Sequence, residues 1–168
     1  MIISFIRHGK TKGNLEKRYI GRTDEPLSQI GRKELMKMQY PECDIVISSK
    51  MKRCIETAEI IYPKSKIVIV NGLEECDFGD FEGMNYLELS GNSDYQKWID
   101  SGGILPFQNG ENIDDFKKRC IEAFEKAVTE YCDYKSMAFV VHGGTIMSVL
   151  EKYAVPKRNY YNFQVKNG

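Results

Sequence analysis

The sequence predicts an α/β fold: a three-layer α/β/α sandwich around a mostly parallel sheet with an antiparallel edge strand. Four short and nearly continuous apolar runs, at residues 2–6, 44–48, 66–70 and 137–141, have the pattern of strands that are covered on both faces. Helical patterns lie between these runs, and strands that alternate with helices build a layered α/β domain. A final alternating segment, Tyr160–Lys166, suits the edge strand.

Four segments have the apolar spacing of amphipathic helices. They cover approximately residues 28–38, 51–61, 113–131 and 143–155. Ser28 is a favourable N-cap for the first of them. Pro63 and Pro156 mark where the second and the last must end, because the residue before a proline avoids the helical conformation.

Residues 76–110 differ from the rest of the chain, since they are rich in Gly, Asp and Ser and only weakly periodic. We expect a partly helical excursion over the carboxyl edge of the sheet, where a lid would lie. Its aromatic residues, among them Tyr95, Trp98 and Phe107, either line a substrate pocket or pack the excursion down. No linker or repeat divides the chain, so a single domain over residues 1–168 is expected.

Composition limits the classes of partner. The 24 basic and 24 acidic residues cancel, which argues against a nucleic-acid or membrane partner, and any positive field must be local. Five cysteines form no CxxC pair, so buried free thiols are favoured over disulfides. No signal-peptide or membrane-spanning pattern is visible, and we expect a cytoplasmic protein. The sequence leaves monomer and homodimer open.

Polar side chains follow three of the predicted strands. The chain has only two histidines, and both His8 and His142 come directly after apolar runs. Arg7 precedes His8, Arg53 lies in the helix after the second strand, and Glu75 follows the third strand. Ligands of open α/β sheets bind at the carboxyl ends of the strands, so these groups are expected to converge there.

These groups have the chemistry needed to bind and transfer a phosphoryl group. They are two arginines, two imidazoles, a carboxylate and a helix amino terminus. Arginine binds phosphoryl oxygens bidentately, and helix amino termini favour anions. An imidazole can act as a nucleophile, and a carboxyl group can protonate the leaving oxygen. A single histidine is more often structural, and a metal site is the other alternative. The histidines lack metal-ligand spacing, however, and the arginines would repel a cation, so neither metal nor cofactor is expected.

Five ordered blocks carry a resemblance to a known family. They read FIRHGKTKGN, YIGRTDEPLSQIGRKEL, SSKMKRCIETAEI, LEECDFGDFEG and VVHGGTI. The first matches the pattern RHGxTxxN and the third SSxxxRxxxTA. Together they resemble the histidine phosphatase superfamily, with its phosphoglycerate mutase-like fold, over nearly the whole chain. Within it, the chain is most similar to the small phosphatase branch that includes α-ribazole phosphate phosphatases.

The resemblance implies a role for each matched residue. His8 would be the phosphorylated nucleophile and Glu75 the proton donor, while Arg7, Arg53 and His142 would bind phosphoryl oxygens. Supporting substrate or phosphate contacts would come from Asn14, Gly21, Thr23 and Gly143.

Two residues depart from the family pattern. Lys10 stands where many relatives have Glu, and Glu74 places a second carboxylate beside Glu75.

The implied activity is hydrolysis of a small phosphorylated metabolite, without metal or cofactor, through a phosphohistidine. α-Ribazole 5′-phosphate is the specific candidate. A phosphoglycerate mutase is the main alternative, and a non-catalytic phospho-ligand binding module is a further one. The mutase would need to keep water from its intermediate, and no insertion suited to that is visible in 168 residues.

Overall fold

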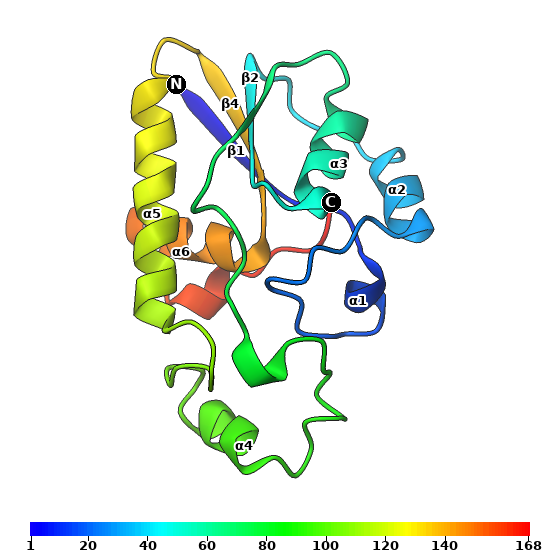
Figure 1. Ribbon diagram of the computed structural model, residues 1–168. Helices are drawn as coiled ribbons and strands as arrows, with labels where there is room; N and C mark the ends of the chain where they lie inside the picture. Colours follow the sequence, from blue (N-terminus) through cyan, green and yellow to red (C-terminus); the bar gives the residue numbers. More distant parts are fainter.

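A four-stranded parallel sheet forms the centre of the computed structural model, which describes all 168 residues (Figure 1). The strands are β1 (Ile2–Arg7), β2 (Ile45–Ser48), β3 (Ile67–Ile69) and β4 (Ser136–Val141). Their order across the sheet is β1-β4-β2-β3, and all three pairings are parallel. The four predicted strands are therefore confirmed, with ends that differ by at most one residue.

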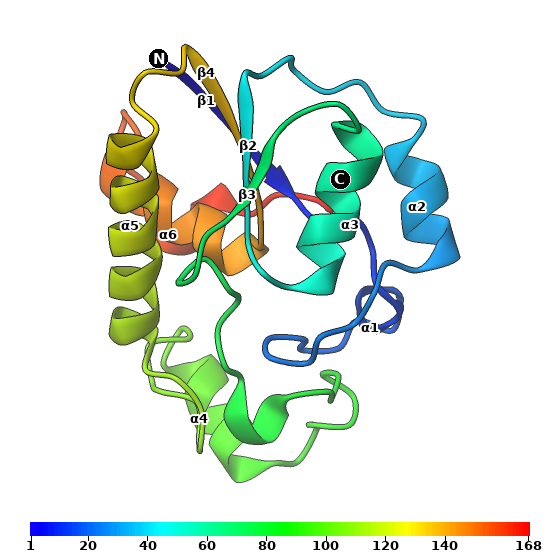
Figure 2. The same cartoon turned by 45° about the horizontal axis from the view of Figure 1, so that its top comes forward.

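Helices cover both faces of this sheet. The helices are α1 (Lys12–Leu15), α2 (Gln29–Leu35), α3 (Lys52–Ile61), α4 (Ser93–Asp100), α5 (Ile113–Glu130) and α6 (Gly143–Tyr153). In Figure 2, α5 and α6 lie on one side of the sheet, whereas α2 and α3 lie on the other. The predicted three-layer α/β/α sandwich is confirmed.

Successive residues of each strand pack alternately against the two helical layers. Ile47 and Phe139 pack with Phe124 of α5, whereas Val46 and Val140 belong to the cluster beneath α3. All five side chains are buried. Because both faces of the strands contact helices, the strands have apolar side chains in nearly every position, which is why their sequence runs are continuous.

Helix α2, the first of the four predicted helices, begins where the sequence predicts and ends earlier. The hydroxyl of Ser28 accepts a hydrogen bond from the backbone N–H of Gly31 at 2.9 Å, as an N-cap does. The helix ends at Leu35 instead of near residue 38, and Met38 is about half exposed.

The predicted antiparallel edge strand is wrong. Residues 160–163 form a short 3-10 helix, followed by an extended segment without strand partners. Alternation predicted that Tyr161 and Val165 would share a buried face, but both are exposed while Tyr160 is buried. Tyr160 packs with Phe116 of α5, and its hydroxyl faces the carbonyl oxygen of Gly144 in α6, so a tertiary contact overrides the local pattern.

The excursion over residues 76–110 contains α4 and packs around a core of its own. Phe81, Leu89 and Phe107 are buried there against Phe116 and Cys120 of α5. Figure 1 shows this part below the carboxyl ends of the strands, as the sequence predicts. The five cysteines are free, and three of them are buried. None of the helices has the length and apolar character needed to cross a membrane.

Candidate functional site

The register of the sheet brings the ends of three strands together. Arg7 of β1 pairs with Val141 of β4, and Ser48 of β2 pairs with Val140. The residues that follow, His8, Ser49 and His142, therefore leave the sheet at the same level. The backbone N–H of His8 donates to Val141 at 2.9 Å, which continues the ladder by one residue and fixes the position of this histidine.

The two histidine rings lie close together in a buried place. Their centroids are 5.2 Å apart with the rings at 64°, and the residues are 4% and 0% exposed. Burial, the charge of Arg53 and then that of Arg7 hold the pKa of His8 well below the usual value. Burial and Arg53, joined by His8, do the same to the pKa of His142. Both imidazoles are thus neutral at neutral pH.

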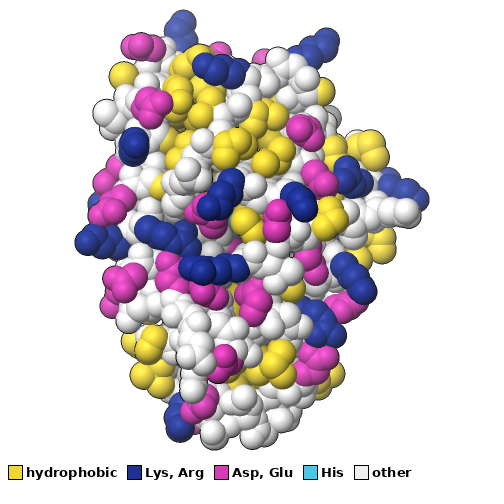
Figure 3. All heavy atoms as spheres, viewed as in Figure 1, with side chains coloured by type: hydrophobic (Ala, Val, Ile, Leu, Met, Phe, Trp, Pro, Cys, Tyr) yellow, Lys and Arg dark blue, Asp and Glu magenta, His cyan; other side chains and the backbone are white.

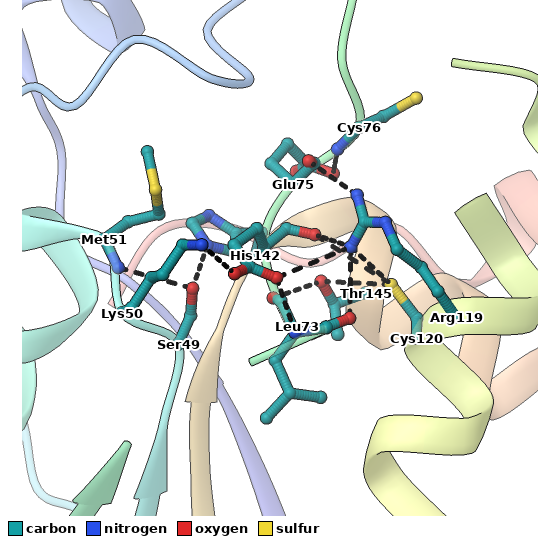
Figure 4. A network of polar contacts seen from close by, with 12 residues as sticks. Ser49, Lys50, Met51, Leu73, Glu75, Cys76, Arg119, Cys120, His142 and Thr145 are labelled. Carbon is teal, nitrogen blue, oxygen red and sulfur yellow. Dashed lines mark hydrogen bonds and ion pairs between the residues drawn. The ribbon is translucent and has the colours of Figure 1, made fainter. Parts of the chain in front are cut away.

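Hydrogen bonds assign a tautomer to each ring. Nδ1 of His8 lies 2.7 Å from the carbonyl oxygen of Gly9. A carbonyl can only accept, so Nδ1 carries the proton and the lone pair is on Nε2. In His142, Nδ1 accepts from Nε of Arg53 at 3.3 Å, and Nε2 donates to the hydroxyl of Ser49 at 2.9 Å. Figure 4 shows this contact between Ser49 and His142.

Arg53 is fully buried at the start of α3, and backbone carbonyls orient its guanidinium. Nη1 donates to Thr23 at 2.8 Å and Nη2 to Gly21 at 2.7 Å. The carboxylate of Glu82 in turn accepts the backbone N–H groups of Gly21 and Thr23, each at 2.9 Å. Gly21 and Thr23, which the sequence predicts to contact the phosphate, thus lie around Arg53. Their N–H groups are already bonded to Glu82.

Gly21 also allows the chain to pass close to the loop that follows Glu75. A Cβ at this position would lie 1.8 Å from the carbonyl oxygen of Cys76. Any other residue would force the two segments apart, because backbone atoms cannot yield in the way that a flexible side chain does.

Glu75 is bound to the amino terminus of α6. Its carboxylate accepts the backbone N–H of Gly144 at 3.1 Å and that of Cys76 at 3.1 Å. A Cβ at Gly144 would lie 2.2 Å from the carboxylate oxygen Oε1 of Glu75, so only glycine permits this approach. Glu74 faces elsewhere, since its carboxylate forms an ion pair with Lys50 at 2.9 Å. The two adjacent carboxylates are therefore in different surroundings.

Arg119 of α5 holds the loop that carries both carboxylates. Its guanidinium donates to the carbonyl oxygens of Gly72, Glu74 and Glu75 at 2.9–3.0 Å. Glu111 binds the same guanidinium through both oxygens, at 2.6 and 2.8 Å. In Figure 4, Arg119 reaches this loop from the helix on the opposite side of the view from Ser49.

Arg7 lies beside the start of α6. A Cβ at Gly143 would be 3.4 Å from its guanidinium carbon, so the two groups are in contact. Nη1 of Arg7 donates to the carbonyl oxygen of Val165 at 2.9 Å, whereas Nε is buried without a partner. An unpaired buried donor costs about 1–3 kcal/mol, so a bound phosphoryl oxygen would recover free energy here.

Asn14 and Lys10 are the more peripheral of the predicted residues. The amide oxygen of Asn14 accepts the N–H of Thr11 at 3.1 Å in a capping box of α1, which leaves its amide nitrogen for a phosphoryl contact. Lys10 forms an ion pair with Glu34 at 2.9 Å, and this pair compensates its charge.

Five residues that the sequence reasoning did not single out also belong to this site. Ser49 binds His142, Glu82 and Arg119 hold the two loops, and Tyr160 and Val165 line the cavity beside Arg7. Glu82 does have a signal in the sequence, because it lies in LEECDFGDFEG, one of the blocks that carry the family resemblance.

Comparison with known proteins identifies the family. The model of the histidine phosphatase superfamily (branch 1) matches residues 3–168. The chain belongs to this superfamily.

Two curated relatives of this histidine phosphatase are themselves phosphatases. The broad-specificity phosphatase YOR283W of Saccharomyces cerevisiae is 32% identical over 160 residues, which cover 87% of this chain and 67% of that protein. The adenosylcobalamin/alpha-ribazole phosphatase of Escherichia coli is 25% identical over 177 residues, 100% of this chain and 87% of that one. These relatives support an enzyme that hydrolyses phosphate esters.

A solved structure agrees with these relatives. The alpha-ribazole phosphatase of Shigella flexneri superposes with a TM-score of 0.85 at 26% identity, and the match covers 99% of this chain and 87% of that one. The phosphoglycerate mutase-like fold expected from the sequence is confirmed.

Proposed function

We propose that this histidine phosphatase is a metal-independent phosphomonoesterase that hydrolyses a small phosphorylated metabolite through a phosphohistidine on His8. The observation that carries the proposal is the hydrogen bond from Nδ1 of His8 to Gly9 at 2.7 Å. It leaves a lone pair on Nε2 of a neutral imidazole that lies next to the buried Arg53 and the half-buried Arg7. A neutral nitrogen can attack phosphorus, whereas an imidazolium cannot.

The first step transfers the phosphoryl group. Nε2 of His8 attacks phosphorus in line, the bond from phosphorus to the ester oxygen breaks, and Glu75 gives its proton to that oxygen. Arg7, Arg53 and the N–H groups that begin α6 stabilise the charge on the equatorial oxygens. His142 would donate to the same oxygens with the Nε2–H that the Ser49 hydroxyl accepts in this structure, while Arg53 holds its Nδ1.

The second step releases phosphate. Glu75, now a carboxylate, takes a proton from water as the water attacks phosphorus. The bond between phosphorus and Nε2 breaks, and its electron pair returns to the ring. Glu75 serves as acid and then as base, so the enzyme regains its starting protonation state.

α-Ribazole 5′-phosphate is our specific substrate candidate. Two proteins that this chain resembles over nearly its full length, those of Escherichia coli and Shigella flexneri, are alpha-ribazole phosphatases. We propose that the chain acts as a single domain in the cytoplasm.

Hydrolysis of p-nitrophenyl phosphate in the presence of EDTA tests the activity. We expect turnover that persists in the chelator and is abolished in His8→Ala. Full activity in that variant would exclude His8 as the nucleophile. Efficient interconversion of 2- and 3-phosphoglycerate with little hydrolysis would favour a mutase instead, and phosphate-ester binding without turnover would favour a binding module.

A further inference from the structure

A cavity of about 300 Å³ opens beside Arg7 and Glu75. Its apolar walls come from the excursion, from α5 and α6, and from the 3-10 helix near the end of the chain. They are Phe78, Trp98, Phe107, Ile113, Met147 and Tyr161. Arg7 and Glu75 are the only charged side chains in the lining. We call this space the aromatic cavity, and it is where the part of a substrate beyond the phosphoryl group could extend.

The walls of the aromatic cavity are held by contacts between rings. The rings of Trp98 and Phe107 are 5.2 Å apart and tilted by 34°, and Phe78 meets Phe107 edge-to-face at 5.1 Å. Tyr160 and Tyr161 form a further edge-to-face pair at 5.0 Å. Such pairs are favourable geometries for aromatic side chains. The walls are therefore preorganised, and they offer flat apolar surfaces to a ligand.

Two buried side-chain atoms lack a hydrogen-bond partner, and both belong to residues of this cavity. They are Nε of Arg7 and the indole N–H of Trp98. Arg7 stands at the end where the phosphoryl group would bind, and Trp98 belongs to the apolar wall. Since buried donors are nearly always paired, two unpaired donors among the lining residues favour this cavity as a binding site.

A second cavity lies on the other side of Glu75 and has the opposite character. Its charged lining includes Arg22, Lys50, Glu74 and Arg119, and we call it the charged cavity. Each of its cations is already compensated: Lys50 by Glu74 at 2.9 Å and Arg119 by Glu111 at 2.6 Å, while Arg22 pairs with Asp77 at 3.1 Å. Figure 3 shows basic and acidic side chains interleaved across the middle of one face of the molecule.

We propose that the aromatic cavity is the leaving-group subsite, and that it takes an uncharged alcohol bearing an aromatic ring while it rejects an anionic alcohol. The proposal rests on the proposed function, because it assigns the ester oxygen to Glu75. A ring would bury its faces between the walls, whereas a carboxylate would lose water without gaining a cation, because the phosphoryl group takes Arg7. The lining thus selects by charge as well as by shape.

Two esters of primary alcohols test the subsite. In 2-phenylethyl phosphate the alcohol carries a ring, and in the phosphate ester of 3-hydroxypropionate it carries a carboxylate. We expect kcat/KM to favour the first by roughly 30- to 100-fold, as burial of one ring predicts. Equal values, or a preference for the carboxylate, would overturn the assignment and would point to the charged cavity.

Binding of the matching phosphonates separates the subsite from the chemistry. Calorimetry on the wild-type protein should show tighter binding of 2-phenylethylphosphonate than of 2-carboxyethylphosphonate. If this preference is present but neither ester is hydrolysed, the proposed function fails and the subsite stands. If both esters are hydrolysed and the phosphonates bind alike, the phosphatase stands and the subsite is wrong.

A positive charge placed in the wall should weaken the preference for the aromatic ester. Met147→Lys puts a cation in the aromatic cavity, and we expect the kcat/KM ratio of the two esters to fall at least roughly tenfold. Met36→Lys is the matched control, because Met36 is exposed at the end of α2 and does not line the cavity. A ratio that stays unchanged in folded Met147→Lys would contradict the proposal.

Discussion

Arg53 donates from Nε to Nδ1 of His142 at 3.3 Å, so the guanidinium and the second histidine form one buried unit. The contact determines the tautomer of His142 and directs its remaining N–H to Ser49. It also brings a fixed positive charge against both imidazoles, which lowers the pKa of each ring. Arg53 therefore orients the site, and burial together with its charge keeps the histidines neutral.

Replacement of Arg53 by Lys should be severe although the charge is retained. Lysine cannot donate to Gly21, Thr23 and His142 at once, as the planar guanidinium does. We expect kcat/KM for p-nitrophenyl phosphate to fall by about 10²-fold or more. Arg158→Lys, at an exposed position, is the control and should behave as wild type. A loss below threefold in Arg53→Lys would rule out this arrangement.

Glu75→Gln should discriminate between leaving groups. An aryl oxide departs without protonation, whereas an alkoxide needs the proton that we assign to Glu75. Rates for alkyl phosphates should therefore fall by at least roughly tenfold more than rates for aryl phosphates. Glu74→Gln is the matched control, since this carboxylate faces Lys50, and it should slow both classes alike. Equal losses for the two classes in Glu75→Gln would assign the proton to another group.

Arg119 should act as a positioning residue for Glu75. Arg119→Met removes the donors that bind the carbonyl oxygens of Glu74 and Glu75, so the acid should lose its alignment. We expect kcat to drop more for alkyl than for aryl phosphates, by roughly tenfold, which a general loss of folding would not produce. Lys118→Met, one residue earlier on the exposed side of α5, should show no such pattern.

Stability should fall in mild acid because of the histidines. Burial first, and then Arg53, hold both histidine pKa values below the usual value in the folded protein. In the unfolded chain these residues bind protons as the pH falls below about 6.5, so acid favours unfolding. By pH 5.5 the loss relative to neutral pH should approach about 1 kcal/mol for each histidine.

Urea titrations at pH 7.5 and 5.5 measure this effect, and His8→Asn is the comparison. The variant retains the carboxylates of the wild type but has lost one of the two titrating rings. Its free energy of unfolding should therefore depend less steeply on pH. A variant as sensitive to pH as the wild type would show that His8 is protonated in the folded state.

Much of the site could be predicted because it lies where strands end. A buried strand can be recognised in the sequence from its continuous apolar residues. The residues that follow such a strand leave the sheet at its carboxyl edge, so His8 and His142 could be predicted to lie together. Arg53 and Glu75 follow from the same topology. Family resemblance was needed to choose Glu75 over Glu74, since the residues alone do not show which carboxylate faces Lys50.

Contacts between distant loops could not be predicted in this way. Glu82 binds Gly21 from 61 residues away, and Arg119 binds Glu75 from 44 residues away. No periodicity in the sequence encodes such pairs. The segment after Tyr160 was mistaken for a strand for a related reason: its alternation is a local signal, whereas its conformation follows from the burial of Tyr160.

The most direct test of the central claim is to trap the phosphorylated enzyme. A rapid acid-free quench during turnover, followed by peptide mass spectrometry, should find a phosphoryl group on His8 that resists alkali and is lost in acid. His8→Asn should give none. A phosphoryl group on another residue, or undiminished turnover in His8→Asn, would contradict the account.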